Sequence, residues 1–334
     1  MPWLQVVLTS DRERAPLIEA ALENAGALAV TLGDAGDEPQ LEPPPGATPL
    51  WGQVLITALF EPDASSRRTA ETLAEALAGD LAAPPRFETL DDQAWEHTWR
   101  DDFAPTPFGQ RLWVCPRGQR PDPEPPDAVI VELDPGLAFG TGHHPTTALC
   151  LEWLDGLDLR GASLIDYGCG SGILAIAALK LGAVQALAVD HDPQALEATQ
   201  ANAGENGVAD RLVILAPGEL SPGLGGPGNP EVPAASPGVP SDVLRGATWR
   251  SGADYLVANI LAGPLIELAP SLASLVRPGG GLALSGLLAD QSAAVAQAYA
   301  PWFDLAPPVR REDWVLLAGH RREDPRQNPD AKQG

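Results

Sequence analysis

The sequence has few of the features that mark a secreted or membrane-bound protein. Its three cysteines, Cys115, Cys150 and Cys169, are too few for a disulfide framework, and none lies in a CxxC pair. A membrane-spanning helix needs about 18 consecutive apolar residues, and no apolar run in the sequence approaches that length. The N-terminus has neither the basic leading segment nor the apolar stretch of a signal peptide. We therefore expect a globular protein of the reducing cytoplasm that binds no membrane.

Positive charge is also scarce. The chain of 334 residues has 21 Lys and Arg against 45 Asp and Glu, which gives a net charge of −24, and its only lysines are Lys180 and Lys332. Such a surface repels phosphate backbones, so we expect no direct nucleic-acid binding and favour a basic protein as partner. Adaptation to a salty cytoplasm would produce the same charge, and composition does not separate the two explanations. The length allows two domains with separate cores.

The first 92 residues alternate between strand and helix patterns. In helix 12–26 the apolar residues Leu17, Ala21, Leu22 and Ala25 lie at helical spacing and predict its buried face. The order β-α-β-β-α-β predicts a small ferredoxin-like α+β domain, with strands at 3–9, 27–34, 51–60 and 86–90 and helices at 12–26 and 64–79. Because no histidines, cysteines or clustered carboxylates converge there, we interpret residues 1–92 as a substrate-recognition domain, with a purely structural role as the alternative.

Segments rich in proline, glycine and polar residues mark the expected connections. Residues 93–133 are interpreted as a linker helix followed by connecting strands, and the Pro- and Asp-rich stretch 116–127 as a linker that allows two domains to swing. The Gly/Pro-dense stretch 217–250 predicts a flexible surface insertion. The polar tail 321–334 is expected to be flexible.

Residues 134–320 show the pattern of an α/β domain. Continuous apolar strands separated by helical stretches predict a Rossmann-like, mostly parallel, seven-stranded sheet with helices on both faces. The strands are expected at 163–168, 185–190, 211–215, 254–259, 281–286, 303–307 and 313–318, and the clearest helices at 145–157 and 289–300.

The strongest local motif follows the strand that ends at Asp166. Gly168, Gly170 and Gly172 predict a tight turn that opens a helix and lets the backbone approach a ligand closely. Asp190 stands at the tip of the next strand, where a carboxylate suits the two hydroxyls of a ribose. Together these residues indicate a cofactor that contains a nucleoside.

The identity of that cofactor is less direct, because residues 170–175 also satisfy the GxGxxA pattern of NAD-dependent dehydrogenases. Asp166 would place a negative charge near the pyrophosphate of a dinucleotide, whereas it suits the sulfonium and ammonium groups of S-adenosylmethionine. An additional helix before the glycine turn also departs from the dinucleotide pattern. We therefore favour S-adenosyl-L-methionine and keep a dehydrogenase as the alternative.

Further candidates lie on either side of this motif. Thr146 and Thr147 begin a helix, where their hydroxyls either cap the helix or contact a ligand. The side chains of His143 and His144 diverge and lack a third ligand, so we expect no metal site.

Asn259 ends the fourth strand, at the edge where open α/β sheets bind ligands. Its amide oxygen can accept hydrogen bonds from an amine and orient the amine lone pair, while capping of the next helix is the alternative role.

The segments AFGTGHHPTT, IDYGCGSGILAIAALKLGA, VDHDPQAL and VANILAGPL together resemble the bacterial PrmA-type methyltransferases of the large-subunit ribosomal protein eleven. This family belongs to the class I S-adenosylmethionine-dependent methyltransferase superfamily. The similarity covers residues 134–220 and 253–320, and the first half of the chain fits the family's substrate-binding domain more loosely. The insertion at 217–250 is longer than the family leads us to expect, and His143 replaces a frequent threonine.

The resemblance implies an enzyme that uses S-adenosyl-L-methionine, and we expect it to be a monomer. Its expected activity is the N-methylation, up to trimethylation, of lysine side chains and of the terminal α-amine of that ribosomal protein. By resemblance, Asn259 is the candidate catalytic residue, and the cofactor contacts are Thr147, Gly168, Asp190 and Asn259, with Gly170 and Thr146 beside them. A methyltransferase of another protein, a nucleic acid or a small molecule remains the alternative.

Overall fold

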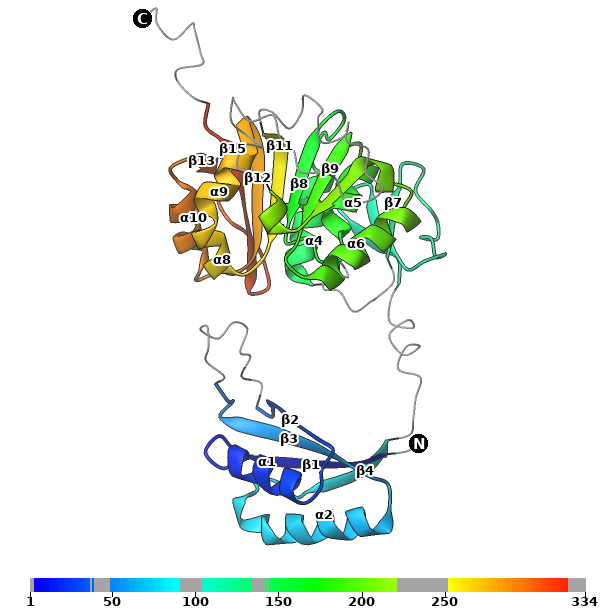
Figure 1. Cartoon of the computed structure of the whole chain (residues 1–334), viewed down its shortest axis with the longest axis vertical. Coiled ribbons are helices and arrows are strands. Elements are labelled where there is room, and N and C mark those ends of the chain that lie inside the picture. Colours follow the sequence, from blue (N-terminus) through cyan, green and yellow to red (C-terminus); the bar gives the residue numbers. More distant parts are fainter. Residues whose placement is uncertain are drawn as a thin grey trace, which may run out of the picture. The chain divides into compact units, whose positions relative to one another are not determined.

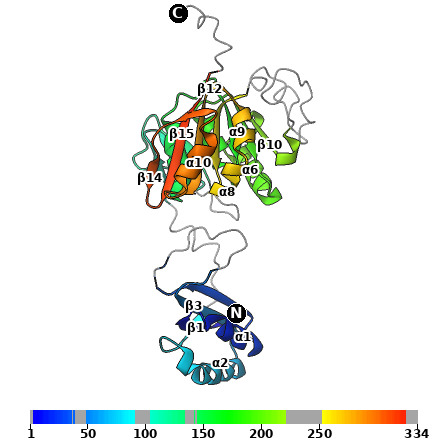
Figure 2. The ribbon, with the colours of Figure 1, turned by 90° about the vertical axis from the view of Figure 1, so that its left-hand side faces the viewer.

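The computed structural model describes residues 3–36, 38, 49–90, 104–133, 142, 144–220 and 252–323. The chain divides into two compact units, Met1–Trp95 and Glu96–Gly334 (Figures 1 and 2). The linker helix expected near residues 93–103 and most of the insertion at 217–250 lie outside the described residues. Within the described ranges, no helix combines the length and apolar character needed to cross a membrane.

The first unit has the ferredoxin-like topology that the sequence predicts. Its four strands are arranged in the order β2-β3-β1-β4 with every neighbouring pair antiparallel. Two helices pack on one face of the sheet and share a hydrophobic core with it. The elements are β1 (Trp3–Asp11), α1 (Ala15–Asn24), β2 (Ala29–Asp34), β3 (Gln53–Phe60), α2 (Ala64–Ala76), the 3-10 turn η1 (Ala78–Asp80) and β4 (Arg86–Leu90).

The buried face of α1 matches the prediction only in part. Leu22 is buried and Ala25 packs against the core as predicted, but Leu17 is 68% exposed, and Ala15 and Ile18 are buried in its place. The spacing 15–18–22 forms a helical stripe as regular as the one predicted from Leu17, so periodicity alone could not choose between them. The position of β3 and β2 decides which stripe meets the sheet.

The second unit contains the predicted, mostly parallel sheet. Its strand order is β10-β9-β8-β11-β12-β15-β13, in which the first five strands are parallel and β15 and β13 are antiparallel to their neighbours. The seven strands are β8 (Ser163–Tyr167), β9 (Gln185–Val189), β10 (Leu212–Leu215), β11 (Ala253–Asn259), β12 (Val276–Leu288), β13 (Phe303–Leu305) and β15 (Trp314–Arg321). An eighth short strand, β14 (Val309–Arg311), pairs only with β15 and was not predicted.

Helices cover both faces of this sheet, which explains the continuous apolar strands. Leu164 of β8 belongs to the core beneath α4, α5 and α6, and the next residue, Ile165, to the core beneath α8, α9 and α10. The helices are α4 (Pro145–Asp155), α5 (Ile173–Lys180), α6 (Pro193–Glu205), α8 (Ala262–Glu267), α9 (Ala269–Leu275) and α10 (Ser292–Tyr299), with 3-10 turns η2 (Ala209–Arg211) and η3 (Pro217–Glu219) (Figure 1).

Residues 104–133 form a small sheet within the second unit. Strands β5 (Thr106–Phe108), β6 (Leu112–Cys115) and β7 (Val129–Glu132) contribute Phe108, Leu112 and Val131 to the core that contains α4 and α5. The carboxylate of Asp155, at the end of α4, accepts the backbone N–H of Gln110 at 2.5 Å. The prediction that 116–127 links two domains is therefore wrong, because this stretch connects β6 to β7 inside one unit.

A side-chain amide covers part of the outer edge of β7. The backbone N–H of Glu132 donates to Oδ1 of Asn206 at 2.8 Å, and Nδ2 of Asn206 donates to the Glu132 carbonyl at 2.8 Å. Asn206 directly follows α6. These two bonds attach the end of α6 to the small sheet and satisfy the backbone of Glu132 as a neighbouring strand would.

Candidate active site

The predicted cofactor and amine residues meet at the carboxyl edge of the parallel sheet. Strand β8 has β9 on one side and β11 on the other, so the chain reverses its direction of winding at β8. Ligands of open α/β sheets bind at such a reversal, outside the carboxyl ends of the strands. The glycine turn follows β8, Asp190 follows β9 and Asn259 ends β11.

The glycine turn requires glycine for two physical reasons. Gly168, Gly170 and Gly172 all have positive φ angles, of 79°, 53° and 78°. A Cβ on Gly168 would lie 2.2 Å from Cγ2 of Ile260, and one on Gly172 would lie 2.7 Å from Cγ2 of Thr199. The turn is thus packed closely against the residue that follows Asn259 on one side and against α6 on the other.

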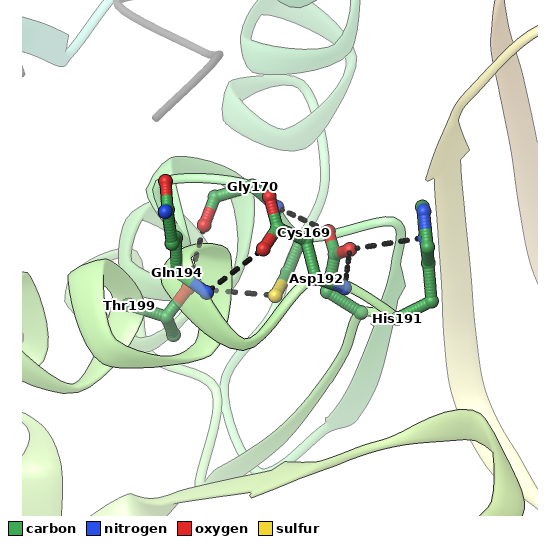
Figure 3. Close-up of polar contacts among 7 residues, drawn as sticks. Cys169, Gly170, His191, Asp192, Gln194 and Thr199 are labelled. Atoms are coloured by element: carbon green, nitrogen blue, oxygen red, sulfur yellow. Dashed lines mark hydrogen bonds and ion pairs between the residues drawn. The ribbon is translucent and has the colours of Figure 1, made fainter. Parts of the chain in front are cut away.

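Asp190 is held in place by the same turn. One carboxylate oxygen accepts the backbone N–H of Gly170 at 2.9 Å, and the other accepts that of Asp192 at 3.0 Å. The hydroxyl of Thr199 donates to the Gly170 carbonyl at 3.0 Å and lies 3.4 Å from Sγ of Cys169 (Figure 3). Oδ1 of Asp190 also lies 3.4 Å from Nδ1 of His191, while among the described residues Oδ2 has only the Gly170 N–H as partner and keeps acceptor capacity for a ribose hydroxyl.

Asp166 lies buried beneath the turn with one oxygen unsatisfied. Its Oδ2 accepts the backbone N–H of Ala175 at 3.0 Å, and among the described residues its buried Oδ1 has no hydrogen-bond partner. Burial raises the pKa of this carboxyl to about 7, and the nearby charge of Asp190 acts in the same direction. The side chain of Asp166 is fully buried, so its carboxyl has no exposed surface at this edge of the sheet.

Asn259 is joined to the first turn of α4. Its Nδ2 donates to the hydroxyl of Thr147 at 3.2 Å, which leaves the amide oxygen as an acceptor. The following helix, α8, starts after Leu261 without a side-chain cap, so the alternative role of Asn259 as a helix cap is wrong. Asn259 and Thr147 therefore form one polar pair beside the glycine turn.

The threonines do not cap α4 either. The N-cap is His144, whose Nδ1 accepts the backbone N–H of Thr146 at 3.4 Å and lies 2.7 Å from the Thr146 hydroxyl. Both Thr146 and Thr147 are buried. His143 lies outside the described residues.

Sequence reasoning missed one part of this edge, the turn between β14 and β15. The ring of Trp314 contacts that of His144 edge to face, with centroids 4.9 Å apart. Burial lowers the pKa of His144, and the charge of Glu312 opposes that shift. The sequence did predict a strand at 313–318. If that strand is antiparallel to the strand beside it, its first residues lie at the carboxyl edge of the parallel strands, and this was the one signal that could have placed Trp314 there.

Metal ligation finds no support in the described ranges, which contain no group of three or more histidine, cysteine, aspartate or glutamate side chains placed to hold an ion. The edge itself presents the glycine turn, the carboxylate of Asp190, the buried carboxyl of Asp166 and the amide of Asn259.

Comparison with known proteins gives the family. The family model described as ribosomal protein L11 methyltransferase (PrmA) matches residues 2–322 of the chain. The chain belongs to this family. The curated ribosomal protein L11 methyltransferase of Nitrosococcus oceani is 50% identical over 326 residues, covering 96% of this chain and 100% of that protein. That of Methylococcus capsulatus is 49% identical over 321 residues, covering 96% and 99%.

A solved structure supports the fold of the L11 methyltransferase family for this chain. The crystal structure of a ribosomal protein L11 methylase from Lactobacillus delbrueckii subsp. bulgaricus has a TM-score of 0.51 and 29% identity, and the match covers 66% of this chain and 100% of that one. The family confirms the predicted resemblance, the Rossmann-like methyltransferase fold and the enzyme class. It decides against the dehydrogenase alternative.

Proposed function

We propose that the chain uses S-adenosyl-L-methionine to methylate ribosomal protein L11 at lysine side chains and at the N-terminal α-amine, up to the trimethylated state. The observation that carries this proposal is the position of the Asn259–Thr147 pair directly beside the glycine turn. One edge of the sheet thus offers a cofactor cradle and an amide that accepts hydrogen bonds from an amine. The names of the relatives support the choice of protein substrate.

The residues at this edge fit the cofactor. The positive φ angles of Gly168 and Gly170 shape the turn that faces the cofactor, and Asp190 offers its oxygens to the ribose. Thr146 and Thr147 lie buried at the start of the neighbouring helix. In its ionised form, the buried carboxyl of Asp166 favours a ligand with a positive sulfonium and ammonium group over a dinucleotide. When bound, S-adenosyl-L-methionine supplies an electrophilic methyl group; the protein supplies binding and orientation.

The amine must lose its proton before it can act as a nucleophile. A lysine side chain has a pKa near 10.4 and an α-amine one near 7.7–8.0, so both are largely or partly protonated at neutral pH. Burial beside a cationic ligand lowers these pKa values through desolvation and charge repulsion. The amide oxygen of Asn259 then accepts an N–H of the neutral amine and directs its lone pair, while Thr147 fixes the amide. The proton leaves to solvent, and we assign no general base.

The first unit serves in this proposal as the recognition domain for the basic ribosomal protein. The net charge of −24 complements a basic partner and opposes direct binding of nucleic acid. We further propose that the enzyme acts in the cytoplasm as a monomer.

The test is methylation of purified ribosomal protein L11 by the full-length enzyme and S-adenosyl-L-methionine, followed by intact-mass analysis. Mass should rise in steps of one methylene group on the protein, and peptide mapping should place the methyl groups on lysines and on the N-terminus. Free ribosomal RNA and an unrelated basic protein serve as competing substrates. Methyl transfer to RNA, or none to ribosomal protein L11, would contradict the proposed function.

A further inference from the structure

The turn between β14 and β15 is attached to the first helix of the catalytic unit. Arg311 of β14 forms an ion pair with Glu152 of α4 at 2.7 Å, and Trp314 at the start of β15 contacts the ring of His144. Because α4 also carries Thr147, the partner of Asn259, this one helix contacts both the β14–β15 turn and Asn259. The turn therefore lies beside the proposed active site.

The backbone of this turn is strained at Glu312. Its φ angle of 55° makes it the only residue other than glycine with a positive φ in the described part of the chain. A long side chain is disfavoured in this conformation, which glycine or asparagine adopt more readily. Such strain is concentrated at functional sites and persists where the surroundings enforce it.

The surroundings of Glu312 hold its backbone and leave its carboxylate available. Nε of Arg310 donates to the Glu312 carbonyl at 2.5 Å, and Nη2 of the same side chain pairs with Asp313 at 3.3 Å. Both arginines of β14 therefore already pair with other carboxylates, Arg310 with Asp313 and Arg311 with Glu152. Within the part of the chain that the structure describes, the exposed Glu312 carboxylate makes no hydrogen bond or salt bridge, and its charge acts on His144.

We propose that Glu312 and Trp314 form the acceptor entrance of the methyl-transfer site, which selects a protonated primary amine of a basic protein and delivers it to Asn259. This inference rests on the proposed function. The Glu312 carboxylate attracts the ammonium group, and the half-buried ring of Trp314 receives it through a cation–π contact. Both residues are positioning residues, because they act on the arriving amine before its proton leaves to solvent.

The test compares full-length Glu312→Gln with the matched control Asp313→Asn, which removes the neighbouring carboxylate that Arg310 already neutralises. We expect Glu312→Gln to raise the KM for ribosomal protein L11 about five- to tenfold, with kcat within twofold and an unchanged Kd for S-adenosyl-L-methionine. The effect should shrink at high salt, where exposed charges are screened. Asp313→Asn should leave KM within twofold.

Two further variants separate recognition from a structural role of the turn. Glu312→Gly relaxes the positive φ, so its Tm should not fall, yet its KM should rise as in Glu312→Gln. Trp314→Leu should raise KM about tenfold, and Trp314→Phe should restore part of the loss, because phenylalanine keeps a weaker aromatic face.

Three outcomes would overturn the inference while leaving the proposed function intact, provided that the wild type methylates ribosomal protein L11. They are equal effects of Glu312→Gln and Asp313→Asn, an unchanged KM in Glu312→Gly, or a loss in kcat alone. A wild-type enzyme that transfers no methyl group to this substrate would overturn the proposed function and the inference with it.

Discussion

The amide nitrogen of Asn259, the last residue of β11, donates a hydrogen bond to the hydroxyl of Thr147 in the first turn of α4, 3.2 Å away. This bond connects a helix that precedes the first parallel strand with the end of the fourth, across 112 positions of the chain. The bond orients the amide through its nitrogen and leaves the amide oxygen free to accept a hydrogen bond from a substrate amine. The side chain that we assign to the amine is therefore positioned before any substrate arrives.

Replacing Asn259 should affect turnover more than cofactor binding. We expect Asn259→Ala to lower kcat about 100-fold at saturating S-adenosyl-L-methionine, because misplacement of the reacting amine carries a penalty of that order. Thr147→Val, which keeps Asn259 but removes its hydroxyl partner, should show a smaller loss. Steady-state kinetics together with calorimetric cofactor binding measure both effects. Full turnover by Asn259→Ala would contradict the role of this residue.

Replacing Asp190 should weaken cofactor binding. We expect Asp190→Ala to raise the Kd for S-adenosyl-L-methionine at least tenfold, since hydrogen bonds to a charged group contribute about 1.5–3 kcal/mol each. The matched control is Asp192→Asn, two residues away, because asparagine can still cap α6 through the N–H of Gln194. Equal cofactor affinity of the two variants, measured by calorimetry, would refute the assignment of Asp190.

Gly168 should tolerate a methyl group less well than another glycine with the same backbone conformation. Gly161 has a φ of +77° and open space around its missing Cβ, whereas a Cβ on Gly168, at φ +79°, would meet Ile260 at 2.2 Å. Gly161→Ala should cost about 1–2 kcal/mol through the backbone alone. Gly168→Ala should cost about 1–3 kcal/mol more because of overpacking. Urea unfolding of both variants checks this difference, and equal losses would count against it.

The buried Asp166 should make stability depend on pH. Burial raises its folded pKa from 3.8 to about 7, so folding takes up a proton between these values. Its contribution to the free energy of unfolding is therefore fully present below about pH 4 and is lost as the pH rises through 7, at about 1.4 kcal/mol per pKa unit.

Asp166→Asn removes this ionisation, so the decline in Tm between pH 5 and pH 7 should become shallower than in the wild type. The control is Asp158→Asn. The exposed Asp158 has its pKa lowered to about 2 by Arg160, so it stays ionised throughout this range. An unchanged slope in Asp166→Asn, measured by thermal unfolding across the pH series, would show that Asp166 does not titrate there.

The sequence predicts much of the second unit because its signals are local. Continuous apolar strands follow from burial on both faces, and Gly168, Gly170 and Asp190 stand directly after strands whose carboxyl ends share one edge. These residues could be placed together from strand order alone. The Rossmann-like fold, the ferredoxin-like fold and the cofactor side of the site therefore needed no knowledge of distant contacts.

The features that sequence reasoning missed depend on contacts between distant segments. Strand β14 is three residues long and its Val309 is 53% exposed, so no alternating pattern marks it. The buried stripe of α1 is set by the sheet beneath it rather than by its own spacing. His144 becomes a neighbour of Trp314 only because β15 folds back antiparallel beside β12.

The amide of Asn206 has a consequence for how the molecule behaves at high concentration. An edge strand with unpaired backbone N–H and C=O groups can pair with a strand of another molecule and lead to aggregation. At Glu132 the donor and the acceptor that such a strand would need are already occupied by one side chain from the end of α6. Asn206 thus protects the protein against intermolecular strand addition at this position.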